Sequence, residues 1–166
     1  MRKILTATMA ATALAAAGSA NAAIATTTFG VTATVLKTCS VAANALGFGN
    51  YTPGAGALAA NTTVNVKCTK GTTFTVALNG GTTAGGTITQ RLMTNGADTL
   101  QYNLYTTAAF ATLFGDGTTG VTMPGTGTGI ATAVALTVFG SLPDNATNQN
   151  VSTGAYSDTI NVTVTY

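Results

Sequence analysis

Apolar and polar residues alternate along much of the chain. The final segment shows this most clearly, because asparagine and threonine separate its apolar residues Ile160, Val162, Val164 and Tyr166. A period of two, rich in β-branched and aromatic side chains, is typical of strands that bury one face. The same alternation predicts strands in segments 29–35, 64–68, 74–78, 100–104 and 136–138.

Turn signals separate these predicted strands. Asn95-Gly96 lies between two apolar runs, which is a strong hairpin signal. Asp116-Gly117 indicates a second tight turn, and the glycine-rich segment 125–129 is interpreted as a flexible loop. No segment after residue 22 has a sustained helical period. About seven strands with short turns predict an all-β, antiparallel sandwich.

The first 22 residues have the organisation of a secretory signal peptide. Arg2 and Lys3 precede an apolar stretch, and Ala20-Asn21-Ala22 supplies a small-residue cleavage site. A membrane span is the alternative, but it needs about 20 strongly apolar residues, and this stretch is shorter and weaker. We therefore expect a signal peptide at 1–22, one domain at 23–166, and export of that domain from the cytoplasm.

Removal of the signal peptide changes the charge balance. The whole chain has 6% charged residues and a net charge of +2. Without Arg2 and Lys3, the basic residues Lys37, Lys67, Lys70 and Arg91 balance the four acidic residues, which are all aspartates. A clustered basic surface is absent from this pattern, so nucleic acid is not an expected partner. A neutral surface permits self-association.

The sequence offers little for catalysis. It contains no histidine, so a histidine-paired nucleophile and an imidazole metal ligand are excluded. Four scattered aspartates and two cysteines are a poor set of metal ligands. We expect no enzyme activity, no catalytic residues, no metal, no cofactor and no small-molecule substrate.

Cys39 and Cys68 are the two cysteines of the chain. Export places them in an oxidising compartment, where one disulfide is the only possible pairing within the chain. Two free thiols remain the alternative. The spacing between Cys39 and Cys68 is far too long for a CxxC redox pair.

The segment before the cysteines, 23–36, contains no charge and forms an apolar-faced strand in this interpretation. Natural edge strands usually carry charge, proline or a bulge that prevents pairing with other chains. Two hypotheses follow. The segment is either an ordinary first strand of its own sandwich or a strand offered to a neighbouring copy.

Several motifs, in their order and spacing, resemble the spore coat protein U domain found in subunits of archaic chaperone–usher pili. The resemblance covers essentially the whole chain after residue 22. The motifs are the alternating run 29–35 before Cys39-Ser40-Val41, then segments 46–51, 64–71, 91–93, 100–105, 114–117 and 138–140, and finally segment 154–166.

The resemblance implies an immunoglobulin-like sandwich that is incomplete until a donor strand fills a groove in it. By position, the donor residues are Phe29, Val31, Ala33 and Val35, with Cys39 and Cys68 as the family's disulfide. The last strand, which would border the groove and pair with the chaperone, carries Ile160, Val162, Val164 and Tyr166. The implied partners are a periplasmic chaperone, an outer-membrane usher, and other copies of this chain or related pilins.

The function implied is that of a structural subunit of an extracellular fibre assembled by donor-strand exchange, which supports adhesion or biofilm formation. One alternative is a secreted spore or cell-surface coat protein of the same fold. A pilus-associated adhesin is a further alternative, disfavoured because the chain has no tryptophan and few tyrosines for a sugar site.

Overall fold

A computed structural model describes residues 22–166 of the chain. The expected signal peptide, apart from Ala22, lies outside these residues. The chain divides into two units, Met1–Thr34 and Val35–Tyr166, and each is described by itself. Among the described residues, no helix is long and apolar enough to cross a membrane.

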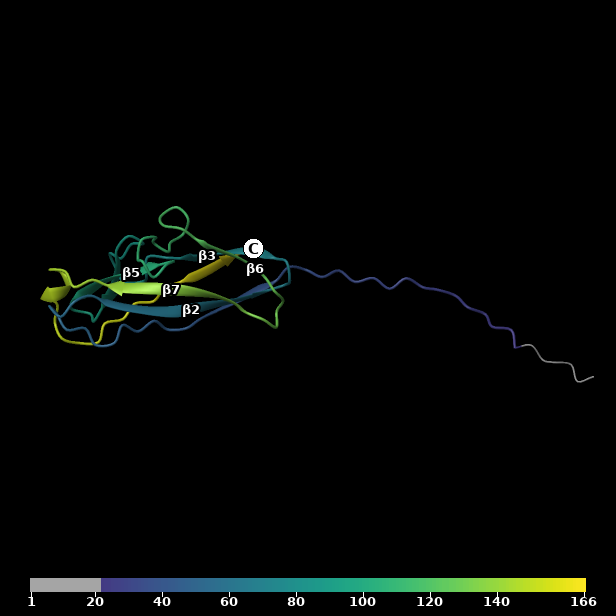
Figure 1. Ribbon diagram of the computed structural model, residues 1–166, viewed down its shortest axis with the longest axis horizontal. Helices are drawn as coiled ribbons and strands as arrows, with labels where there is room; N and C mark the ends of the chain where they lie inside the picture. Colours follow the sequence, from purple (N-terminus) through teal and green to yellow (C-terminus); the bar gives the residue numbers. More distant parts are fainter. Residues whose placement is uncertain (1–21) are drawn as a thin grey trace, which may run out of the picture. The chain divides into compact units, whose positions relative to one another are not determined.

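The second unit contains two antiparallel sheets (Figure 1). The five-stranded sheet has the spatial order β1 (Cys39–Ala43), β2 (Leu58–Cys68), β7 (Val134–Leu142), β5 (Thr99–Tyr105) and β4 (Arg91–Thr94). The three-stranded sheet has the order β6 (Met123–Thr126), β3 (Thr73–Leu78) and β8 (Val162–Thr165). One short 3₁₀ helix, Asn148–Asn150, completes the described elements. The predicted all-β antiparallel class is confirmed, with eight strands in residues 22–166 instead of about seven.

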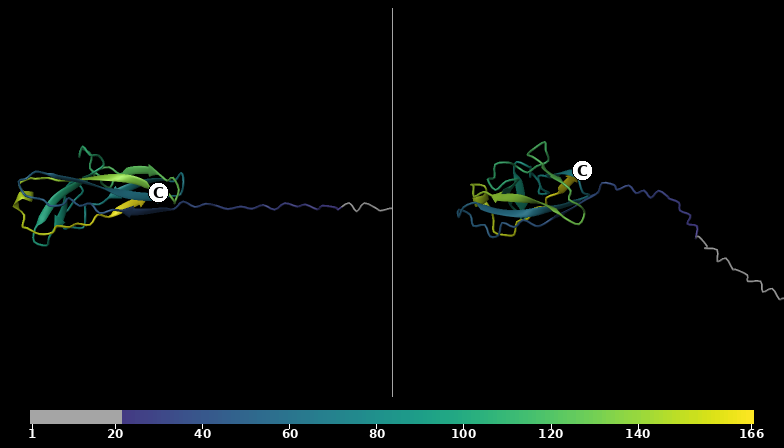
Figure 2. Two further views of the ribbon diagram at one scale, coloured as in Figure 1. Left: turned by 60° about the horizontal axis from the view of Figure 1, so that its bottom comes forward. Right: turned by 45° about the vertical axis from the view of Figure 1, so that its right-hand side comes forward.

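The core lies between the inner faces of the two sheets. Alternate residues of β3, β5, β7 and the second half of β2 are buried, as the period of two predicts. The five-stranded sheet buries residues of β2, β5 and β7, and the facing sheet buries those of β3. The buried core consists of Val64, Val66, Cys68, Phe74, Val76, Leu78, Leu100, Tyr102, Leu104, Phe114, Leu136, Val138 and Leu142. Figure 2 shows this unit from two further sides, with β8 in yellow.

The predicted hairpin at Asn95-Gly96 is confirmed. It joins β4 to β5, and the Asn95 side-chain oxygen accepts hydrogen bonds from the backbone N–H groups of Ala97 and Asp98. Gly96 has a positive φ of 93°, which is readily adopted only by glycine.

The interpretation of segment 125–129 as a flexible loop is wrong in part, because Gly125 and Thr126 belong to β6. The reason is a close approach of two strands. Gly125 lies opposite Phe74 of β3, and a Cβ at Gly125 would be 2.3 Å from Cζ of that ring. Glycine is therefore required by packing at this position and not by loop flexibility.

Residues 22–38 contain no strand. An ordinary first strand of the chain's own sandwich, one of the two sequence-based hypotheses, is therefore not formed. Their large apolar side chains are exposed, with Phe29 86%, Val31 82% and Val35 80% accessible. Exposure of several large apolar side chains in one segment is typical of a site of interaction.

Candidate functional site

Two strand edges adjoin a groove in the second unit. β1 is the last strand of the five-stranded sheet, and β8 is the last strand of the three-stranded sheet. Each pairs with a neighbour on one side only, β1 with β2 and β8 with β3. The two strands lie near each other, yet no ladder between them is present among residues 22–166. Both edges therefore present backbone N–H and C=O groups without a strand partner.

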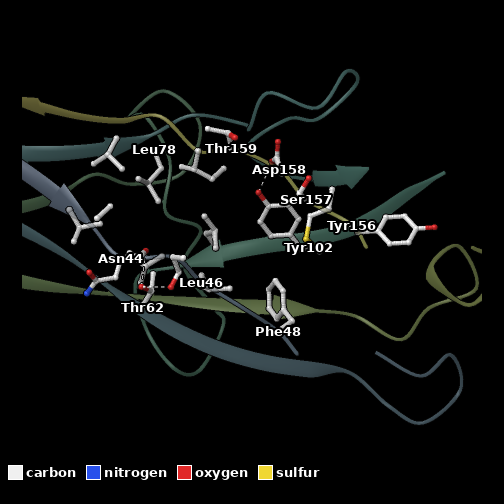
Figure 3. A pocket seen from close by; sticks show the side chains of 18 residues that line it. Asn44, Leu46, Phe48, Thr62, Leu78, Tyr102, Tyr156, Ser157, Asp158 and Thr159 are labelled. Atoms are coloured by element: carbon white, nitrogen blue, oxygen red, sulfur yellow. Dashed lines mark hydrogen bonds between the residues drawn. The ribbon is translucent and has the colours of Figure 1, made fainter. Parts of the chain in front are cut away.

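A cavity of about 500 Å³ lies beside these edges (Figure 3). Ile160 and Val162 line it from the side of β8. Ala43, at the end of β1, and the segment that follows it line the other side. Apolar residues that project inward from the strands also line it, among them Val64, Leu78, Leu104 and Val138. The cavity is thus an opening into the hydrophobic core between the sheets.

The segment after β1 forms one wall because a glycine makes room for it. Leu46 and Phe48 pack against Gly140 of β7, where a Cβ would lie 2.9 Å from Leu46 Cδ1 and 3.0 Å from Phe48 Cζ. Phe48 also makes an edge-to-face contact with Tyr102, at 6.1 Å between ring centroids. Such pairs stabilise beyond simple burial. The wall is therefore held by packing on the inner face of the five-stranded sheet.

Farther along the chain, the segment that follows β1 is attached to Asp144 by hydrogen bonds. This carboxylate accepts hydrogen bonds from the Tyr51 hydroxyl at 2.5 Å and from the N–H groups of Gly54 at 3.0 Å and Gly56 at 2.7 Å. The bonds from Tyr51 and then Gly54 lower the pKa of Asp144 from 3.8 to about 2. Burial, and then the bond to Asp144, raise the pKa of Tyr51 to about 12.

A second carboxylate fixes the segment that leads into β8. Asp158 accepts a hydrogen bond from the Tyr102 hydroxyl at 2.6 Å, drawn in Figure 3. It also accepts bonds from the backbone N–H groups of Thr82 at 2.9 Å and Thr83 at 3.0 Å. Because Tyr102 lies in β5 and Asp158 precedes β8, the contact joins the five-stranded sheet to the segment that leads into β8.

These contacts shift the pKa values of both Asp158 and Tyr102. Burial opposes ionisation of Asp158, yet the hydrogen bonds from Tyr102 and Thr83 keep the pKa of this carboxyl below its usual value. Burial, followed by the bond to Asp158, raises the pKa of the Tyr102 hydroxyl. The pair is therefore a carboxylate and a neutral phenol over the ordinary pH range.

Arg91 is fully buried, and no pattern in the sequence predicts a structural role for it. Its Nε donates to the carbonyl of Asn79 at 2.9 Å, and Nη2 donates to that of Phe114 at 2.8 Å. Burial lowers its pKa, while Tyr102 and Asp158 favour the charged form. The side chain thus satisfies carbonyl groups of two loops near the groove.

The four predicted groove residues of the last strand occupy different environments. Ile160 precedes β8, and both it and Val162 line the cavity. Val164 packs against the core, outside the cavity lining. Tyr166 follows β8 and is 55% exposed. The structure therefore brings two of the four to the cavity.

The remaining predicted residues are placed as follows. Cys39 and Cys68 form a disulfide, and they are register partners at the start of β1 and the end of β2. Phe29, Val31, Ala33 and Val35 lie in the exposed segment without a strand.

Sequence reasoning missed the wall after β1 and the contact between Tyr102 and Asp158. The alternation at 100–104 correctly predicts that Tyr102 points into the core. Nothing in the pattern indicated that its hydroxyl would meet a carboxylate 56 residues away. Contacts of this length are decided by how the sheets pack.

The lining has few groups for chemistry. Asp158 is its one charged residue, and Thr62, Ser157 and Thr159 add hydroxyls. Within residues 22–166, no three of His, Cys, Asp and Glu lie close enough together to hold a metal ion. An apolar groove beside free backbone edges is suited to an extended strand, with main-chain hydrogen bonds along the edges and apolar side chains inside.

This architecture defines an antiparallel β-sandwich that is open along one side. The chain belongs to the Spore Coat Protein U domain family, whose family model matches residues 25–163. A curated relative, Protein U of Myxococcus xanthus, is 34% identical over 188 residues, which cover 100% of this chain and 98% of the relative.

The fold is also similar to that of a solved chain, with a TM-score of 0.55 and 22% identity. That chain belongs to the CsuC–CsuE chaperone–tip adhesion subunit pre-assembly complex, from archaic chaperone–usher Csu pili of Acinetobacter baumannii. The match covers 80% of the present chain and 40% of the solved one. It supports the similarity of fold.

Proposed function

We propose that this chain is a structural subunit of an extracellular fibre, assembled by the chaperone–usher pathway through donor-strand exchange. The observation that carries the proposal is the apolar cavity of about 500 Å³ beside the unpaired edges of β1 and β8. A strand inserted there would cover core residues and pair with free backbone groups. A second copy of the chain can supply such a strand.

The segment around 29–35 has the properties of that strand. Phe29, Val31 and Val35 share one parity, so all three would enter the groove together. Each of them is at least 80% exposed. Burial of a large apolar side chain contributes about 1.5–3 kcal/mol, and Ala33 contributes less. The three large residues would therefore provide most of the apolar stabilisation.

The same groove explains why assembly needs helper proteins. An open core exposes apolar surface and two strand edges, which favour aggregation before a donor arrives. In this proposal a periplasmic chaperone covers the groove until an outer-membrane usher brings the next subunit. The finished fibre is exported to the cell surface, where it supports adhesion or biofilm formation.

Deletion of residues 23–35 tests the proposal. The truncated chain should still bind the chaperone but lose the ability to polymerise, because it keeps the groove and lacks the donor. Surface material is examined by gel electrophoresis with and without boiling, since donor-strand polymers should run as a heat-sensitive ladder. Fibres formed by the truncated chain would refute the donor assignment.

A matched pair of substitutions refines this test. Val31→Asp places a charge on the inward parity of the donor, whereas Thr32→Asp places it on the opposite, solvent-facing parity. We expect the first to abolish the ladder and the second to preserve it. Equal effects of the two would contradict the proposed parity.

A coat protein of the same fold is the second candidate. The family match and the 34% identity to Protein U over nearly its whole length favour it. Donor exchange would then link subunits on a spore or cell surface and not in thin fibres. Electron microscopy of exported material distinguishes filaments from a continuous layer.

A further inference from the structure

The outer face of the five-stranded sheet carries aromatic side chains. Tyr105 of β5 and Phe139 of β7 are cross-strand partners and point away from the core, because their neighbours Leu104, Val138 and Gly140 are buried. Outward positions of an antiparallel sheet are usually polar. An aromatic row here therefore invites a functional explanation.

A third aromatic residue packs against the tyrosine ring. Phe110 contacts Tyr105 edge-to-face at 5.5 Å between ring centroids. Phe110 has a positive φ of 52°, which is unfavourable for a bulky residue. A strained turn that packs against this half-buried ring indicates that the orientation of the ring is maintained.

A hollow of about 390 Å³ adjoins this ring on the same face. Its volume is at the lower end of the range for small-molecule sites. Asn103 and Ser141, another cross-strand pair, lie in the row next to Tyr105. Gln90, Gln101 and Asn145 provide further amides to the lining, which contains no charged residue.

Part of this polar set is engaged in the fold. The Asn145 amide donates to the Gln101 side-chain oxygen at 3.0 Å, and Asn103 donates to the Thr89 carbonyl at 2.7 Å. Within residues 22–166, the Gln90 side chain and the Tyr105 hydroxyl have no hydrogen-bond partner, and Gln90 is exposed. The hollow thus combines fixed amides with donors and acceptors that remain available.

The chemistry of the lining selects one class of ligand. Without charge, the hollow offers no attraction to phosphate, nucleic acid or a metal cation. Amides both donate and accept, which matches the hydroxyls of a sugar. The face of an aromatic ring packs against the C–H groups of a pyranose. We propose that this hollow is a binding site for a neutral hexose or N-acetylhexosamine of a glycan.

This site shares one residue, Tyr102, with the lining of the donor-strand groove. The rest of β5 is divided between them, because Leu104 projects inward and lines the groove, whereas Asn103 and Tyr105 face outward and line the hollow. A subunit could therefore hold a donor strand and a sugar at the same time. The inference does not rest on the assembly pathway and would hold equally for a coat protein. It departs from the sequence-based expectation that a chain with no tryptophan and few tyrosines lacks a sugar site, because the fold places one of those tyrosines, Tyr105, beside a neutral hollow.

Saturation-transfer difference NMR with the full chain as recovered from the cell surface tests the site. The method observes the ligand, so polymers of any size are suitable. The probes are the methyl glycosides of glucose, galactose, mannose and N-acetylglucosamine. We expect transfer to the ring protons of at least one probe, with a Kd on the order of 1 mM.

Variants assign the signal to the hollow. Tyr105→Ala should weaken binding about tenfold, and Gln90→Ala should weaken it without affecting folding, because that side chain is exposed. Thr137→Ala, outward on β7 but outside the hollow, is the matched control and should bind normally. If Tyr105→Ala fails to fold, Gln90→Ala decides the outcome. Absence of transfer for all four probes, or binding unchanged in the decisive variant, would overturn the proposal.

Discussion

At the scale of residues, two aspartates organise the walls of the groove. Asp158 connects the segment before β8 to Tyr102 and to the backbone of Thr82 and Thr83. Asp144 does the same for the segment after β1, through Tyr51 and two glycine N–H groups. Hydrogen bonds to a charged group are stronger than neutral ones. In a chain with few charges, these carboxylates are used to fix loops.

Tyr102→Phe tests the contact with Asp158. The variant keeps the ring and its packing but removes the hydroxyl from a residue that is only 5% exposed. Loss of a hydrogen bond to a charged partner should lower the free energy of unfolding by about 1.5–3 kcal/mol. Urea unfolding measures the change, and Tyr166→Phe at an exposed position is the control. Equal stability of the two variants would contradict the role of the contact.

The Asp144 contacts predict a pH dependence. The folded-state pKa of about 2 lies below the ordinary 3.8, so the stabilisation is present above about pH 4 and is lost as the pH falls toward 2. We expect the melting temperature of the unmodified chain to exceed that of Asp144→Asn at neutral pH and to approach it near pH 2. A difference that stays constant over this range would show that the carboxylate charge is irrelevant.

At the scale of elements, β1 and β8 are edge strands with unequal support. β8 is held along its length by β3, with Val162 opposite Leu78 and Val164 opposite Val76. β1 pairs with β2 and is also joined to it by the disulfide. The two edges of the groove are thus held differently. Only noncovalent contacts hold β8, whereas a covalent disulfide also holds β1.

Val162→Asp tests β8 as the acceptor edge. Val162 lines the cavity, so a carboxylate there would be buried without a partner by any inserted strand, at a cost of several kcal/mol. Chaperone capture and the heat-sensitive ladder should both be lost. Thr163→Asp, on the exposed face of the same strand, is the control. Recovery of a normal chaperone complex with Val162→Asp would contradict this role.

Replacement of both cysteines by serine tests β1. The bridge closes a loop with a sequence separation of 29, and its loss should cost about 3–4 kcal/mol in the chain-entropy model. Amide hydrogen exchange should accelerate most in β1, since β2 keeps β7 as a second partner. Uniform acceleration over all strands would indicate a global effect instead of a local one.

At the scale of the whole molecule, the low charge means that the proposed assembly would depend on apolar burial and backbone pairing. The lining of the groove has one charged residue, Asp158, and that residue is already hydrogen-bonded. The proposed donor segment has none before Lys37. In the proposed fibre, electrostatic attraction between subunits should therefore make only a minor contribution.

Assembly should accordingly be insensitive to salt. The unboiled ladder should have the same length distribution at low ionic strength and in molar sodium chloride, because screening has little to act on. Gel electrophoresis of material assembled under both conditions measures this. A ladder that shortens markedly in salt would point to a charged interface that the groove does not contain.

Much of the architecture could be predicted from local patterns. Alternation located β2, β3, β5 and β7, and Asn95-Gly96 located a hairpin, because strand periodicity and turn chemistry are local properties. Gly125 was misinterpreted, since its role depends on Phe74 in another strand. The requirement for glycine at position 140 likewise depends on distant residues, because Leu46 and Phe48 pack where a Cβ would lie.

The sequence by itself determined the all-β class, the inward parity of β2, β3, β5, β7 and β8, the single possible disulfide and the absence of histidine chemistry. These follow from residue types and short-range spacing. Only the tertiary structure decided that β1 and β8 end their sheets side by side over an apolar cavity. It also decided that the segment around 29–35 forms no strand within the chain, and that Tyr105 faces a neutral hollow. These features arise from contacts between distant segments, which no local pattern encodes.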